Sequence, residues 1–338
     1  MSRMYKQTSL EHVDNRKYKP LIKWAGGKTR LNSLLLQTAD LALESLNVKK
    51  FNYYEPFFGG GALFFELHSY EKIKNGYIND TIPHLISFYK TVANEELQKE
   101  FLLEVKKLTN DFNNANSDTK RRKLYGEVSK NSGWVNEFNT LWNNKTPQTN
   151  KDKIKSAALF LALNKSGFNG MFRLNSKGQF NIPMGDKTKI DFNEELFKIT
   201  SSILKKTNIF NNSYEQILPP HKKIDKNNSF IYLDPPYIPN SKTESFTDYS
   251  KEGFKEKDHK KLADIFHQLA NDGYKVVLSN NSNKESKLKY ANSKKVFAYE
   301  VMVSRAIAKT NKGKRPPSKE LLVSSFSLDS LGLKKVKT

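Results

Sequence analysis

Apolar and polar positions follow two patterns along most of this chain. Short apolar runs between polar or glycine-rich stretches predict buried strands at residues 51–54, 76–80, 230–233 and 275–280. Apolar side chains at helical spacing predict helices over residues 31–41, 62–69, 85–112, 154–164 and 256–270. Strands that alternate with helices in this way indicate an α/β fold.

The remaining stretches are polar. Residues 1–19 are expected to form a flexible arm, and residues 331–338 a basic tail. Residues 113–152 are rich in Asn, Lys and Thr, and Trp134 and Trp142 lie among them. We interpret this stretch as an insertion or a mobile subdomain.

Charge and composition narrow the class of protein. The 338 residues include 57 Lys and Arg against 35 Asp and Glu, which gives a net charge of +22. This excess favours a polyanion partner, because neutralised phosphates release counterions, although drift in a Lys- and Asn-rich proteome explains part of it. The absence of cysteine excludes disulfides, cysteine-ligated metals and thiol nucleophiles. The six histidines show no ligand spacing, so no metal is expected.

Hydropathy also bears on location. No apolar run approaches the roughly 18 residues of a membrane span, and the polar N-terminus lacks the apolar region of a signal peptide. We therefore expect a soluble, cytoplasmic protein without a membrane partner.

The most informative stretch is Asp234-Pro235-Pro236-Tyr237, which directly follows the predicted strand 230–233. Two prolines cannot donate to a sheet, so the strand ends and the loop is rigid. Ligands bind at the carboxyl ends of strands in open α/β sheets. An acid, a carbonyl and an aromatic ring presented together suit the alkylation of an exocyclic amine on a planar base. Asp234 and the Pro235 carbonyl would accept the hydrogens of the amine, and Tyr237 would stack on the ring. Taken alone, an ordinary turn beside a core tyrosine explains the motif equally well.

A second group of residues predicts a nucleoside cofactor. Strand 51–54 leads into Glu55-Pro56-Phe57-Phe58-Gly59-Gly60-Gly61 and a helix, and Asp80 follows the next strand. An acid about 20 residues beyond the glycines is placed to accept hydrogen bonds from a ribose diol. The turn lacks the Gly-x-Gly-x-x-Gly pattern, and Glu55 would repel a pyrophosphate. S-adenosylmethionine, which has a ribose and an ammonium but no phosphate, therefore fits better than a dinucleotide.

A third stretch, residues 164–185, carries two turn signals, Asn169-Gly170 and Ser176-Lys177-Gly178. Aromatic, amide and arginine side chains accompany them. Such groups read base edges or wedge between bases in nucleic-acid complexes. The alternative is a surface hairpin whose polar and aromatic side chains have no role in binding. The net charge of the protein and the base-sized site elsewhere in the chain favour contact with nucleic acid.

With these motifs in this order, the sequence resembles the Dam-type bacterial DNA adenine-N6 methyltransferases of the D12 class. The resemblance covers about residues 20–327. It includes the Lys-Trp-Ala-Gly-Gly-Lys segment at 23–28, the glycine-rich turn, Asn79-Asp80, the 164–185 stretch, Asp-Pro-Pro-Tyr, Phe-Thr-Asp-Tyr at 246–249 and the basic segment 305–322. It departs from the family at Ser213-Tyr214, where many members have Asp-Phe, and in a longer polar insert around residues 126–150.

The resemblance implies an α/β, Rossmann-like S-adenosylmethionine-dependent methyltransferase fold with an inserted, mostly helical target-recognition region that carries a β-hairpin. It divides the chain into the arm (1–19), a catalytic domain in two parts (20–90 and 201–330), the recognition region (91–200) and the tail (331–338). It implies methylation of adenine N6 in a short sequence of double-stranded DNA, by base flipping and direct in-line transfer. We expect a monomer without a metal. A cognate restriction endonuclease that acts on the same site without a stable complex fits the family, but the sequence leaves open both this partner and an orphan or phage role, as it does the oligomeric state.

Family roles carry over to the matching positions. The cofactor-binding positions are Trp24, Lys28, Glu55, Pro56, Phe57, Gly59, Asp80 and Asp234, and the catalytic ones are Asp234, Pro235, Pro236 and Tyr237. The DNA-recognition positions are Lys23, Phe168, Asn169, Met171, Arg173, Asn175 and Arg305.

Two other functions stay open on the residues alone. The same loop would serve cytosine N4, or an amide nitrogen in a protein or an RNA base. A basic DNA-binding module with a vestigial pocket is the second alternative, and the intact set of Glu55, Asp80 and Asp234 speaks against it. The target sequence is open as well, since Dam-like hairpins occur in enzymes that read GATC or CATG.

Overall fold

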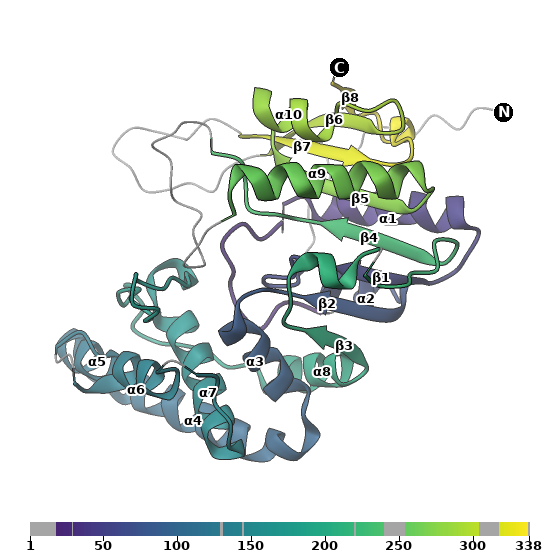
Figure 1. The fold of residues 1–338 in the computed structure, drawn as a ribbon. Coiled ribbons are helices and arrows are strands. Elements are labelled where there is room, and N and C mark those ends of the chain that lie inside the picture. The colour runs from purple at the N-terminus through teal and green to yellow at the C-terminus, as the bar shows by residue number, and fades with distance from the viewer. Residues whose placement is uncertain are drawn as a thin grey trace.

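A computed structural model describes residues 18–28, 30–128, 131–143, 145–219, 221–239, 254–303 and 318–336. In this part of the chain, helices flank one sheet, and a further group of helices lies beyond one edge of it (Figure 1). Most of the predicted arm, the Phe-Thr-Asp-Tyr segment at 246–249 and Arg305 lie outside the described residues.

The described strands form a single mixed sheet in the order β3-β2-β1-β4-β5-β7-β6-β8. They are β1 Phe51–Glu55, β2 Ile73–Asn79, β3 Thr207–Phe210, β4 Ser229–Leu233, β5 Lys275–Asn281, β6 Phe297–Val303, β7 Ser318–Ser324 and β8 Lys334–Lys335. Strands β1 to β5 pair in parallel, whereas β7 is antiparallel to both β5 and β6. The strand order reverses between β1 and β4, and the crevice at the carboxyl ends of such strands is where open α/β sheets bind ligands.

The helices in the described ranges fall into two groups. Those packed on or near the sheet are α1 Asn32–Leu46, α2 Ala62–Ser69, α3 Pro83–Ala93, α8 Glu194–Lys205, α9 Glu256–Asn271 and α10 Lys284–Tyr290. Those that lie beyond the edge of the sheet, and that share its hydrophobic core through α3, are α4 Gln98–Asn114, α5 Asp118–Tyr125, α6 Gly133–Leu141 and α7 Asn150–Ser166. No helix among the described residues has the length and apolar character needed to cross a membrane.

Strand β4 shows why the sheet is covered on both faces. All five of its residues are buried. Successive side chains of a strand point to opposite faces, so Phe230 and Tyr232 pack into the core on the α1 and α2 side, whereas Ile231 and Leu233 pack against α9. In Figure 1, α9 lies in front of the sheet and α1 behind it. This double burial explains the continuous apolar run in the sequence.

The predicted strands and helices are confirmed with small shifts of their ends, except over residues 85–112. One helix was expected there, and the structure has two, α3 and α4, separated by a short 3₁₀ turn. Asn94 adopts an extended backbone at the end of α3, and its side chain accepts a hydrogen bond from the Glu96 amide at 3.0 Å. Asparagine competes with the helix for backbone donors in this way, so the helix restarts in a new direction.

The described part of the polar insert is ordered around buried tryptophans. Trp134 stacks on Phe112 of α4, with ring centres 5.8 Å apart. Trp142 is 9% exposed, donates from its indole nitrogen to Ser156 at 2.6 Å and lies 3.8 Å from the His84 ring. The described part of this stretch therefore packs as helices around the two tryptophans.

The expected β-hairpin at 164–185 is present only in reduced form. Two isolated bridges, Gly167 to Met184 and Leu174 to Phe180, replace regular strands. The Asn169-Gly170 turn forms as predicted: both residues have positive φ, 54° and 65°, and the Met171 amide donates to the Phe168 carbonyl at 3.1 Å. We refer to residues 167–184 as the recognition loop, after the role that the sequence predicts for it.

The packing of Trp142 predicts a loss of stability on truncation. Trp142→Ala leaves a cavity beside His84 and an unpaired Ser156 hydroxyl, and should lower the free energy of unfolding by about 3–5 kcal/mol in urea denaturation. Leu103→Ala, at a position 60% exposed on α4, is the matched control and should change stability little. Equal stability of both variants would contradict an insertion packed on Trp142.

Candidate active site

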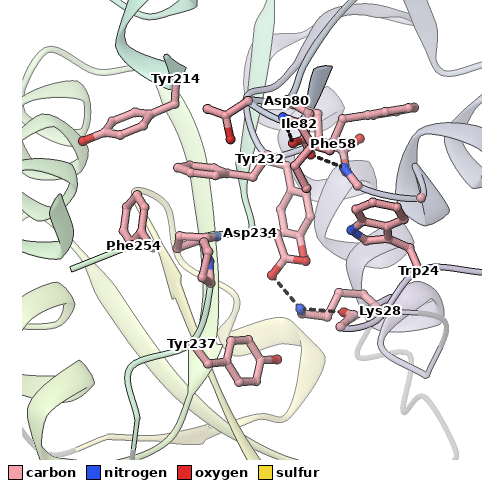
Figure 2. Close-up of a pocket in the computed structure, with 18 of the residues that line it drawn as sticks. Trp24, Lys28, Phe58, Asp80, Ile82, Tyr214, Tyr232, Asp234, Tyr237 and Phe254 are labelled. Carbon is pink, nitrogen blue, oxygen red and sulfur yellow. Dashed lines mark hydrogen bonds and ion pairs between the residues drawn. The ribbon is translucent and has the colours of Figure 1, made fainter. Parts of the chain in front are cut away.

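A cavity of about 740 Å³ opens at the carboxyl ends of β1, β2 and β4. Each of these strands contributes one acid where it ends: Glu55 from β1, Asp80 after β2 and Asp234 after β4. In Figure 2, Tyr214 and Phe254 line one side of the cavity and Trp24 and Lys28 the other, with Asp234 between them. The volume is in the range of sites that hold a whole small molecule.

Asp234 is bound through one of its two carboxylate oxygens. The ammonium of Lys28 lies 2.5 Å from Oδ1, and the hydroxyl of Ser279 donates to the same oxygen at 2.9 Å. Within the described ranges, Oδ2 receives no hydrogen bond. Lys28 also donates to the Gly26 carbonyl at 3.0 Å, which fixes the ammonium in place (Figure 2).

The loop after Asp234 is anchored on both sides. The Tyr237 ring lies under Lys28, with the ammonium 4.7 Å from the ring centre, and its hydroxyl donates to Glu320 of β7. Burial, with the charges of Asp234 and Glu320, raises the pKa of Tyr237 far above its usual value, so the phenol stays neutral. The Ile238 amide donates to Asn280 at 3.2 Å, and Asn281 donates to the Ile238 carbonyl at 2.7 Å. The loop is therefore held at both ends of its proline pair.

Asp80 is fixed by backbone amides of two different segments. Its Oδ2 accepts from Gly59 at 2.9 Å, and its Oδ1 accepts from Ile82 at 3.0 Å. Burial raises the pKa of Asp80, and the two amides oppose that shift. Each carboxylate oxygen keeps a lone pair that can accept a further hydrogen bond from a ligand.

The glycine-rich turn makes room for a tryptophan. Gly59 has φ of 52°, and a side chain there would meet the Trp24 ring at 2.7 Å. A side chain at Gly60 would meet the Cβ of Trp24 at 2.9 Å. Trp24 also stacks on Phe172 of the recognition loop, with ring centres 5.9 Å apart. The glycines thus allow the 23–28 segment to pack closely against the turn. The same lack of side chains also leaves room for a ligand to approach the backbone of the turn.

Glu55 is a buried carboxyl group with a tyrosine donor. The hydroxyl of Tyr53 donates to its Oε2 at 3.1 Å. Burial raises the pKa of Glu55 well above its usual value, the Tyr53 bond and Lys28 oppose this, and the charge of Asp234 adds to it. The site therefore holds an acid that a cationic ligand would ionise.

Aromatic rings form the wall opposite Trp24 and Lys28. Phe57 stacks on Tyr214 with ring centres 5.1 Å apart, and Phe254 meets Phe57 edge-on at 5.8 Å. Tyr214 belongs to the Ser213-Tyr214 pair at which the sequence departs from the Asp-Phe of many Dam-like proteins. The wall is apolar and flat, which suits a planar heterocycle.

Comparison with known proteins decides the family. The model of the D12 class N6 adenine-specific DNA methyltransferases matches residues 24–307. The chain belongs to this family. It is an adenine-specific DNA methyltransferase, and DNA methyltransferases of this family use S-adenosylmethionine.

Named relatives agree with this assignment. The Type II methyltransferase M.MjaIII of Methanocaldococcus jannaschii is 36% identical over 266 residues, which are 78% of this chain and 85% of the relative. The Type II methyltransferase M1.LlaDCHI of Lactococcus lactis subsp. cremoris is 33% identical, over 78% of this chain and 82% of the relative. A DNA adenine methylase of Vibrio cholerae is 30% identical, over 81% of this chain and 86% of the relative. The alternatives of a cytosine or protein substrate, and of a non-catalytic DNA-binding module, are set aside.

The structure separates the predicted methyltransferase residues into two places. The predicted cofactor and catalytic residues line the cavity, apart from Pro56, which lies beside it and whose carbonyl accepts from Asn79 at 3.0 Å. The predicted recognition residues that are described lie outside it, on or beside the recognition loop. Whether they read DNA stays a prediction.

Within the recognition loop, individual side chains differ in availability. Phe168 is 47% exposed, whereas Met171 packs against the core. Asn175 uses its side-chain oxygen inside its own turn, where it accepts from Lys177 at 2.9 Å and Gln179 at 3.0 Å. Its side chain therefore shapes the loop, and reading a base would require it to leave these bonds.

Several residues of the methyltransferase site were missed from the sequence. They are Tyr53, Tyr232, Ser279 and Glu320. Lys165 and Lys187, which lie beside the recognition loop and outside the cavity, were not singled out either. A signal existed for the first two, because Tyr53 and Tyr232 stand two residues before Glu55 and Asp234 and so share a sheet face with them. Ser279 and Glu320 come from strands whose pairing with β4 and β5 the sequence does not reveal.

The raised pKa of Glu55 predicts a pH-dependent stability. The folded state holds this proton more tightly than the unfolded state, so the contribution of Glu55 is favourable at low pH and is lost as the pH rises above the usual glutamate range. Glu55→Gln should therefore raise Tm more at about pH 8 than at about pH 5 in thermal scans. Glu96→Gln, at an exposed position, should show no such difference, and the same result for Glu55→Gln would contradict the buried-acid interpretation.

Proposed function

We propose that this methyltransferase transfers a methyl group from S-adenosylmethionine to N6 of an adenine that is flipped out of a short duplex DNA sequence. The observation that carries the proposal is Asp234, whose Oδ1 is occupied while its Oδ2 receives no hydrogen bond within the described ranges, and which lines the cavity together with Pro235 and Tyr237. Flipping costs a few kcal/mol and brings the base to a site that the intact duplex cannot reach.

The donor set of the cavity fits S-adenosylmethionine. The lone pairs of Asp80 suit a ribose diol, and the buried carboxyl of Glu55 suits the ammonium of the amino-acid end. The ring wall of Phe57, Tyr214 and Phe254 suits the adenine. When bound, this cofactor supplies a methyl group on a positively charged sulfur.

The residues after β4 suit the target amine. Asp234 Oδ2 and the Pro235 carbonyl can accept the two hydrogens of adenine N6, which turns the nitrogen lone pair toward the methyl group. Tyr237 can stack on the base while its hydroxyl stays bound to Glu320. Lys28 holds Asp234 in place through their ion pair. Direct attack of N6 on the methyl group needs no covalent intermediate.

A lysine cluster beside the recognition loop suits the DNA backbone. Burial lowers the pKa of Lys165, and the charges of Lys187 and Lys23 lower it further, whereas Asp191 opposes the shift. The pKa of Lys187 is lowered by burial and by Lys23 in the same way. These three ammonium groups repel one another, so a bound phosphate lowers the electrostatic energy of the cluster more than it would for isolated surface lysines.

The lysine cluster and the recognition loop form one surface. The Lys23 amide donates to Asn164 at 2.9 Å, and a side chain at Gly170 would meet the Cβ of Lys23 at 2.7 Å. Phe168, Asn169 and Arg173 project from the same loop and are exposed. We assign backbone contact to the lysines and base contact to these three side chains.

The remaining expectations belong to the same proposal. The enzyme acts as a monomer in the cytoplasm, and a cognate restriction endonuclease recognises the same site. Two of the relatives are named Type II methyltransferases, which supports the second point.

The target and the reaction are tested together by long-read modification sequencing of a methylation-free host that expresses the chain. We expect N6-methyladenine at every copy of one short motif. Asp234→Asn should reduce transfer about 10³-fold, because an amide cannot accept on both sides, and should leave DNA affinity nearly unchanged. Asp225→Asn, in an exposed turn before β4, should behave as wild type. Methylation at cytosine, or full activity of Asp234→Asn, would contradict the proposal.

The lysine cluster predicts a change in the salt dependence of DNA binding. Lys165→Ala/Lys187→Ala removes two proposed phosphate contacts, so the slope of log Kd against log salt concentration should become shallower by about 2. Lys49→Ala/Lys50→Ala, at the amino end of β1 and away from the cavity, removes the same charge and serves as the control. An equal slope in the two double variants, measured by fluorescence anisotropy, would remove these lysines from the interface.

A further inference from the structure

A chain of two hydroxyl groups leads to the carboxylate of Asp234. The hydroxyl of Tyr232 lies 2.8 Å from that of Ser279, and Ser279 lies 2.9 Å from Asp234 Oδ1. The pairing register of β4 and β5 explains the contact: Leu233 pairs with Leu278, so Asp234 comes opposite Ser279. Tyr232 and Ser279 are both fully buried, so water does not replace either of them.

The chemistry of the groups fixes the direction of this chain. The Asp234 oxygen that pairs with Lys28 accepts hydrogen bonds, and Ser279 donates its single hydrogen to it. The Ser279 oxygen is then left to accept, and Tyr232 must be its donor. The strongly raised pKa of Tyr232, which follows from burial and from the charge of Asp234, agrees with a neutral phenol that keeps its proton.

These two hydroxyl groups matter because the two oxygens of an aspartate are chemically equivalent, and nothing in the side chain itself decides which one faces the substrate. Rotation about the bond to the carboxylate is broad and roughly two-fold, so one ion pair with Lys28 leaves the plane of the group free to turn. Ser279 is a second donor to Oδ1 and restricts the rotation that the Lys28 ion pair alone leaves free. Oδ2 is then the oxygen presented to the cavity.

We propose that Ser279 is a positioning residue for methyl transfer and that Tyr232 orients its hydrogen. Together they occupy Oδ1 of Asp234 and hold Oδ2 toward the amine of the target base. The inference rests on the proposed function and adds the residues that give its acceptor a single orientation. Misplacement of an acceptor lowers the transfer rate while leaving the binding of either substrate intact.

The test compares four variants of the full chain: Ser279→Ala, Tyr232→Phe, the double variant, and Ser229→Ala as control. Ser229 is a fully buried serine of β4 whose hydroxyl has no partner in the described structure. Single-turnover transfer is measured on a duplex that carries the motif, with saturating labelled S-adenosylmethionine. Calorimetry gives the affinity for the cofactor, and anisotropy gives the affinity for DNA.

We expect Ser279→Ala to slow transfer about tenfold and Tyr232→Phe about threefold, with both affinities within about twofold of wild type. Because Tyr232 acts through Ser279, the double variant should be no slower than Ser279→Ala alone. Ser229→Ala should transfer at the wild-type rate. If Ser279→Ala does not fold, Tyr232→Phe tests the inference instead, because it removes the hydroxyl and keeps the ring. Slower transfer with unchanged affinities would support the inference, and wild-type transfer would overturn it.

Three results would overturn the inference: wild-type transfer by Ser279→Ala, losses that add in the double variant, or a rate loss matched by an equal loss of cofactor affinity. The last would indicate a general disturbance of the pocket. A wild-type chain that does not methylate adenine would overturn the proposed function instead, so the two failures are distinguishable.

Discussion

The grouping of three acids in one crevice, Glu55 buried and Asp80 and Asp234 partly exposed, is the constraint on which the site depends. Glu55, Asp80 and Asp234 stand where neighbouring parallel strands end, and each needs a partner because a bare charge is costly there. The partners differ: a tyrosine hydroxyl for Glu55, backbone amides for Asp80, and Lys28 with Ser279 for Asp234. Different partners give these chemically similar side chains different properties, so one crevice presents three distinct acidic groups.

Trp24 links the crevice to the surface beyond it. It packs on Gly59 and Gly60 of the glycine-rich turn and stacks on Phe172 of the recognition loop. Its neighbour Lys23 abuts Gly170 in the same loop. A displacement of the loop by a bound duplex would therefore press on the segment that also carries Lys28, which contacts Asp234. The short 23–28 segment is thus shared by both parts of the site.

Patterns local in sequence could be predicted, and contacts between distant strands could not. Strand β4, the turn after it and the spacing of Asp80 follow from periodicity and from proline and glycine chemistry. The break at Asn94 was missed because the apolar spacing continues across it. The insert looked polar because its many exposed polar and charged residues hide the few buried ones, Trp134 and Trp142 among them, on which it packs. Ser279 could not be assigned, because its role comes from the register of β5 against β4.

The position of the helical region follows from the topology of the sheet. The chain leaves the sheet after β2 and returns at β3, its edge strand, so α4 to α7 are inserted into a connection that crosses no other strand (Figure 1). Glu55 ends β1, Asp234 follows β4, and Ser279 of β5 contacts Asp234. The insertion lies between β2 and β3, so it does not interrupt the pairing of these three central strands. The insertion ends in the recognition loop, and Trp24 holds that loop against the crevice. The 23–28 segment contacts both the crevice, through Lys28, and the loop, through Trp24, and so couples the two.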